Sequence, residues 1–178
     1  MYTSINKQVN HAGFTLFEVL VSLVILCCGM LGMAGLQVSG LRSSATSSYR
    51  TDATQLSYDI ADFMRANTAA VSSNDFANIE YSYNDTLTDP QKSCVQASIT
   101  ATVASCTASE MASVELYGWV TRARQKLPSA SVSVQCNDLN DSDADDCTEY
   151  SSHTVSLSWD ENVDGSVDTN TFSYTFRP

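Results

Sequence analysis

One acidic residue, Glu18, lies near the start of an apolar run that continues to Leu36 and holds no other charge. The run is long enough to cross a bilayer as a helix. A carboxylate inside such a segment costs about 2.5–3.5 kcal/mol on insertion scales. Because so costly a charge marks a functional position by default, Glu18 is the first candidate functional residue.

A second group of reactive side chains consists of four cysteines in the polar part of the chain: Cys94, Cys106, Cys136 and Cys147. Their spacing suits disulfide loops in an oxidising compartment. A metal site would favour closely spaced pairs with histidine partners, and only His153 follows the apolar run. Of the three connectivities we choose the sequential one, Cys94–Cys106 and Cys136–Cys147. The two cysteines within the run are expected to be small buried hydrophobic residues: Cys27 and Cys28.

Two acidic clusters have the residue types that bind calcium. The segment Asp138–Asp146 lacks the glycine of a calcium loop, whereas a later segment matches an EF-hand-type loop at Asp160, Asn162, Asp164, Gly165, Val167 and Asp168. Thr171 stands where that loop needs a bidentate glutamate. Asp164-Gly165 is also a typical hairpin turn, so we favour a hairpin over a calcium site and expect no other cofactor.

Composition argues against two functional classes. The formal net charge of −11 opposes nonspecific binding to nucleic acid. A hydrolytic triad is a poor match, because His153 comes with no identifiable nucleophile and carboxylate pattern. No glycine-rich loop for phosphate is present in the sequence. We therefore expect a non-catalytic protein.

The helical pattern continues beyond the apolar run. Apolar residues recur on one stripe at helical spacing, at Leu41, Ala45, Tyr49, Ala53, Leu56, Ile60, Phe63 and Met64. This predicts one helix from about Phe14 to about Ala70, about 85 Å long. Its first half would lie in lipid and its second half would pack on a head. Four glycines leave two interpretations open, flexibility or close packing: Gly29, Gly32, Gly35 and Gly40.

The remaining residues predict a small head. A short strand is expected around Ile79–Tyr83, and a turn at Asp89-Pro90. A capping-box pattern at Thr107–Glu110 starts a second helix that ends before Pro128. Its last turns hold three cations that we assign to the helix dipole rather than to a docking patch: Arg122, Arg124 and Lys126. Alternation predicts antiparallel strands over 132–136, 155–159 and 172–176. The fold class is α+β, with a long N-terminal helix packed by a small antiparallel sheet and one extra helix.

The N-terminus resembles the class III signal of type IV prepilins, because a hydrophilic leader, the Gly13–Phe14 junction, Glu18 and the apolar run occur together. The resemblance implies that a prepilin peptidase cuts after Gly13 and methylates the amine of Phe14. A secretory signal peptide would place its apolar region before the cleavage site. A lipoprotein anchor would want a small residue just before its cysteine, which neither Cys27 nor Cys28 has. An uncleaved signal anchor remains the alternative.

Further segments resemble the PilV family of minor pilins (type IV pilus modification proteins), most sharply Gly13–Gln37 and Tyr58–Asn67. This implies a pilin-like fold and a subunit that primes pilus assembly with other minor pilins and supports twitching motility or adhesion. Glu18 would pair with the methylated amine of Phe14, its own or a neighbour's. The expected organisation is a leader (1–13), a transmembrane half-helix (14–36), an amphipathic half-helix (37–71) and a head (72–178).

The implied location is the inner membrane, with a single pass and the head in the periplasm, and then the pilus. The cysteines support export, whereas Lys7 before the run and Arg42 and Arg50 after it do not. Two alternatives stay open: a pseudopilin of a type II secretion system, and a membrane-anchored module that binds calcium or another ligand.

Overall fold

The computed structural model describes residues 13–92, 94, 105–137, 147, 151–163 and 166–178. The chain divides into two compact units, residues 1–44 and 45–178. The described elements, in chain order, are α1 (Leu16–Ala66), α2 (Thr68–Ser72), β1 (Ile79–Tyr81), α3 (Ala108–Lys126), β2 (Ser131–Asn137), β3 (Ser152–Val163) and β4 (Ser166–Phe176).

In the first unit, the described residues after Thr15 all belong to α1, and their apolar side chains are exposed. The most apolar window has a mean hydropathy of 2.5, so length and composition allow this helix to cross a membrane. The helix continues through its four glycines. A Cβ atom at any of them, Gly29, Gly32, Gly35 or Gly40, would meet no described atom within 4 Å. Packing within the described chain therefore does not require these glycines.

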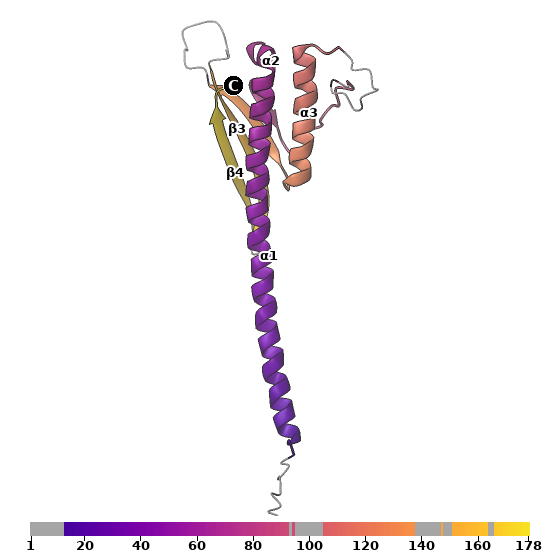
Figure 1. The fold of residues 1–178 in the computed structure, drawn as a ribbon, viewed down its shortest axis with the longest axis vertical. Helices are drawn as coiled ribbons and strands as arrows, with labels where there is room; N and C mark the ends of the chain where they lie inside the picture. Colours follow the sequence, from indigo (N-terminus) through magenta and orange to yellow (C-terminus); the bar gives the residue numbers. More distant parts are fainter. Residues whose placement is uncertain (1–12, 93, 95–104, 138–146, 148–150, 164–165) are drawn as a thin grey trace, which may run out of the picture. The chain divides into compact units, whose positions relative to one another are not determined.

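The second unit is built on an antiparallel sheet with the strand order β1-β2-β3-β4 (Figure 1). The alternation expected from the sequence is confirmed, because one sheet face is apolar and packs on helices, as the α+β prediction requires. In the ladder the apolar residues form rows across neighbouring strands: Val132, Leu157 and Phe172, then Val134, Val155 and Tyr174.

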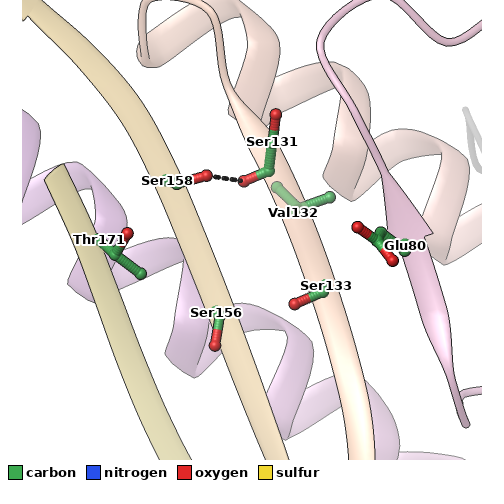
Figure 2. Close-up of a pocket in the computed structure, with 7 residues that line it drawn as sticks. All are labelled: Glu80, Ser131, Val132, Ser133, Ser156, Ser158 and Thr171. Carbon is green, nitrogen blue, oxygen red and sulfur yellow. Dashed lines mark hydrogen bonds between the residues drawn. The ribbon is translucent and has the colours of Figure 1, made fainter. Parts of the chain in front are cut away.

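The opposite face of the sheet is polar. Hydroxyls of adjacent strands bond to each other, at 2.9 Å in both the Thr154–Thr175 and Ser156–Ser173 pairs. A hollow of about 130 Å³ lies on this face. Figure 2 draws the residues that line it: Glu80, Ser131, Val132, Ser133, Ser156, Ser158 and Thr171. Polar side chains suit this face because none of the described helices packs on it.

Helix α3 packs against the C-terminal part of α1 through polar as well as apolar contacts. The Trp119 indole is buried and donates from Nε1 to the Leu56 carbonyl at 2.8 Å. Lys126 Nζ lies 2.8 Å from an Asp52 carboxylate oxygen, and the Arg122 guanidinium lies 5.7 Å from the centre of the Phe63 ring. The cations near the end of α3 thus have partners within the head, which weakens the docking-patch interpretation.

The β3–β4 hairpin is attached to α1 through a buried carboxylate. Glu161 is only 6% exposed. Its Oε1 accepts a hydrogen bond from Trp159 Nε1 at 2.7 Å, and its Oε2 accepts one from Thr46 Oγ1 at 3.0 Å. Burying a carboxylate without hydrogen bonds is energetically unfavourable. The two hydrogen bonds from neutral donors therefore stabilise Glu161 in its buried position.

Two details of the helix prediction were wrong. The helix ends at Ala66 rather than near Ala70, because the Asn67 side chain accepts a hydrogen bond from Ala70 N–H and caps the separate helix α2. The stripe also begins later than predicted: Leu41 and Ala45 are exposed, and the first fully buried member is Ala53.

One buried residue gives the head a pH dependence. His153 on β3 is 1% exposed, and its Nδ1 has no hydrogen-bond partner among the described atoms. Burial lowers its pKa below the usual value of about 6.5, and a hydrogen bond to the Ser151 backbone opposes this effect only in part. Its ring lies 6.3 Å from that of Phe176.

We predict that the wild type loses stability as the pH falls below about 6.5. In this range His153 becomes protonated in the unfolded state but stays neutral in the folded state, so protonation favours unfolding. His153→Phe keeps a ring beside Phe176 and should lose less stability between pH 7.5 and 5.5. Urea unfolding of the full chain in detergent, followed by circular dichroism at both pH values, measures the difference. Equal losses in the two proteins would contradict the assignment, since titration of the carboxylates is common to both.

Candidate functional site

The predicted processing site lies immediately before α1. Gly13 and Phe14 precede the helix and are exposed, the Phe14 side chain at 84%. A Cβ at Gly13 would meet no described atom within 4 Å. A peptidase could therefore reach the bond between them without unfolding any described element.

Thr15 and Glu18 together build the first turn of α1. The Glu18 N–H donates to the Thr15 carbonyl at 3.1 Å and to Thr15 Oγ1 at 3.3 Å. The pattern Ser/Thr-x-x-Glu is a capping-box signature, and a carboxylate in a first helical turn interacts favourably with the helix dipole. Glu18 was expected from the sequence but Thr15 was not, although the same signature predicted the start of a helix at Thr107–Glu110.

The environment of Glu18 defines its chemistry. Its side chain is exposed among apolar neighbours of α1, and no ion pair joins it to a cation of the described chain. The next polar side chain along the helix, Ser22, donates to the Val19 carbonyl at 2.8 Å. In an apolar medium the Glu18 carboxylate needs a cation from outside the described helix. The amine of residue 14, one helical turn away, would be free only after cleavage.

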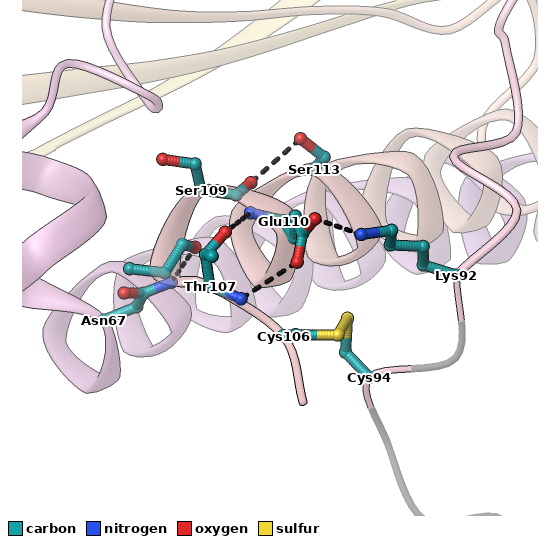
Figure 3. Close-up of a disulfide and its surroundings, with 9 residues drawn as sticks. Asn67, Lys92, Cys94, Cys106, Thr107, Ser109, Glu110 and Ser113 are labelled. Atoms are coloured by element: carbon teal, nitrogen blue, oxygen red, sulfur yellow. Dashed lines mark hydrogen bonds and ion pairs between the residues drawn. A yellow bond between two sulfur atoms is a disulfide. The ribbon is translucent and has the colours of Figure 1, made fainter. Parts of the chain in front are cut away.

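The first disulfide lies at the start of α3. Cys94 pairs with Cys106, with 5.8 Å between their Cα atoms. Figure 3 shows the capping box beside it, where Glu110 N–H donates to Thr107 Oγ1 and Thr107 N–H donates to Glu110 Oε2. The ion pair with Lys92, together with the bond from Thr107, lowers the pKa of Glu110.

The second disulfide closes the connection between β2 and β3. Cys136 pairs with Cys147, with 6.4 Å between their Cα atoms. The structure therefore has the sequential pairing chosen above, and it leaves Cys27 and Cys28 free. Contrary to expectation, these two are exposed rather than buried within the chain. The acidic cluster between the second pair, Asp138–Asp146, lies outside the described residues.

The calcium candidates are distributed over the β3–β4 hairpin. Asp164 and Gly165 lie outside the described residues. Asp160 is opposite Thr169 and accepts its hydroxyl hydrogen bond at 2.8 Å. Asp168 is opposite Glu161, one position further along the ladder, so alternation places Asp160 and Asp168 on opposite sheet faces. Asn162 lies two positions after Asp160 in β3. In the part of the chain that the structure describes, no three acidic, histidine or cysteine residues converge on one point.

Two family models match the chain. The "Prokaryotic N-terminal methylation motif" matches residues 9–34, and "Type IV pilin Tt1218" matches residues 35–117. The first match includes Gly13, Phe14 and Glu18, and the second runs from the exposed half of α1 into α3. No curated protein and no solved structure matches. The two matches and the α+β fold support a type IV pilin subunit that is processed by a prepilin peptidase.

We predict cleavage between Gly13 and Phe14. N-terminal sequencing of the membrane-extracted protein should begin with N-methylated Phe14 in cells that have an active prepilin peptidase. A Gly13→Trp variant should retain Met1, because the peptidase subsite before the cut needs a small side chain. An intact N-terminus in the unmodified chain would refute the processing site.

We also predict that only two of the six cysteines react with an alkylating agent before reduction, and all six after it. Cys27 and Cys28 serve as the internal control in the same mass spectrum. Replacing Cys94 and Cys106 together by serine should lower the free energy of unfolding by about 3 kcal/mol, since each bridge closes a short loop. Six reactive thiols without reduction, or stoichiometric zinc, would contradict both bridges.

Proposed function

We propose that this chain is a minor pilin of the PilV type, a non-catalytic subunit that primes assembly of the type IV pilus together with other minor pilins. One observation carries the proposal: Glu18 lies exposed in the first turn of an apolar helix, and no ion pair joins it to a cation among the described residues. Its counter-ion would be the methylated amine of Phe14, in the same chain or in a neighbour.

The proposed pairing explains why a charge is kept at a costly position. Within lipid or a filament core, an unpaired carboxylate is strongly unfavourable. A subunit placed one step out of register would separate Glu18 from its partner amine, so the pair would fix the axial position of the helix. The function requires no cofactor or metal.

The proposed location follows from the two units. The unit of residues 1–44 offers an apolar helix to the inner membrane and later to other pilin helices. The unit of residues 45–178 would lie in the periplasm, where its two disulfides are stable. Its polar loops would select the partners at the pilus tip or along the shaft, and so support motility or adhesion.

The proposal predicts that Glu18→Ala leaves cleavage and membrane insertion intact but lowers recovery of the other minor pilins in a pull-down by at least about tenfold, because an intramembrane charge pair is lost. Glu18→Gln keeps an amide that can cap the helix but removes the charge, so it should fail equally. Ser22→Ala, which removes only a hydroxyl bonded to the helix backbone, is the matched control and should behave as the wild type.

Rescue by Glu18→Gln would show that Glu18 serves helix capping rather than charge pairing. Deleting the gene should reduce the number of pili while leaving secretion of folded exoproteins unchanged. The reverse result would identify a pseudopilin of a secretion system instead.

A further inference from the structure

The outer edge of β4 presents backbone groups that no strand of the described sheet pairs with. Asp160 N–H donates to the Pro128 carbonyl at 3.0 Å, so this residue of β3 directs its backbone away from β4. Asp160 and the residue opposite it in β4 therefore form a non-hydrogen-bonded pair. In such a pair both residues point their backbone N–H and C=O groups away from each other. The residue opposite Asp160 is Thr169, so the backbone groups of Thr169 point away from β3. Alternation gives Thr171, Ser173 and Thr175 the same outward orientation. No described segment outside the sheet forms a backbone hydrogen bond to these residues.

Aromatic side chains next to this edge are incompletely covered. Phe172 and Tyr174 of β4 are half-buried, whereas their β3 neighbours Leu157 and Val155 are fully buried. Tyr58 of α1 is 50% exposed and meets the Tyr174 ring edge-on, at 5.0 Å between ring centres. Half-exposed tyrosines are typical of surfaces that bind other proteins.

The edge also lacks the features with which proteins usually prevent strand addition. Between Ser166 and Phe176 there is no lysine, arginine or proline, and the only charge is that of Asp168. The pairing with β3 is regular over all eleven positions, without a bulge. A long, regular and largely uncharged edge favours the addition of another strand.

Charge decides against a second copy of this chain as the occupant. Residues 45–178 hold seven Lys and Arg against nineteen Asp and Glu, a formal charge of −12. Two such heads joined edge to edge would repel each other, whereas a basic head would be attracted.

We therefore propose that the outer edge of β4 binds a β-strand from the head of a different, positively charged pilin-type subunit. The strand hydrogen-bonds to the outward backbone groups of β4 and covers Tyr58, Phe172 and Tyr174. The class of the partner rests on the function proposed above; the location of the site rests on the sheet itself.

Proline substitution tests the edge directly. Thr171→Pro removes an outward N–H but no bond to β3, and edge positions of this orientation tolerate proline. It should lower recovery of the partner from the full-length protein in membranes by about tenfold or more, a loss typical of a central contact. Thr171→Ala removes the hydroxyl and keeps the N–H, so its recovery should stay within about twofold of wild type.

Photocrosslinking tests the same site even if the proline variant misfolds. Benzoylphenylalanine at Thr171 should crosslink in cells to a strand of another chain that has an N-terminal methylation motif and a basic head. The same probe at Ser156, on the polar face of the central strand β3, is the control and should give little product. Crosslinking to a second copy, equal yields at both positions, or no product at Thr171 would each overturn the proposal.

Different results would contradict the proposed pilus function and the proposed binding site at the β4 edge. If the chain is a pilus subunit that does not use this edge, Glu18→Ala impairs assembly and Thr171→Pro does not. If the chain has no role in the pilus, deletion of its gene leaves the number of pili unchanged.

Discussion

Burial of one face of α1 beneath the sheet is the interaction on which the rest of the head depends. Leu56, Ile60 and Met64 occupy the centre of a single apolar cluster that also takes in α3 and the inner rows of the sheet. Because the hydrophobic effect scales with the area removed from water, the stripe on this helix determines where both elements lie.

Much of the architecture could be predicted because the local signals agreed with the global pattern. Alternating apolar and polar residues indicated three of the four strands, and the capping box at Thr107 located the start of α3 within one residue. The sequential disulfide pairs were also predicted, since short loops between cysteines are easily closed. Of the candidate site, Gly13, Phe14 and Glu18 were proposed from their spacing at the start of the apolar run, and the match to the methylation motif includes all three.

Other features depended on contacts that spacing does not reveal. The break at Asn67 comes from one side chain that caps the following turn, which overrides a continuous helical pattern. Nothing in the spacing singles out Glu161, and only its closeness to Thr46 and Trp159 shows that it is buried. β3 and β4 are much longer than their apolar alternation, because the ladder continues toward the hairpin through polar residues such as Asp160 and Thr169.

The hydrogen bond between Thr46 and Glu161 joins residues 115 positions apart in the chain. This contact can form only after residue 161 has been synthesised, and contacts so distant in sequence form slowly. Until then, the part of the apolar stripe of α1 that β3 and β4 cover stays exposed. A chain truncated before β3 would keep its membrane helix but never gain a covered head.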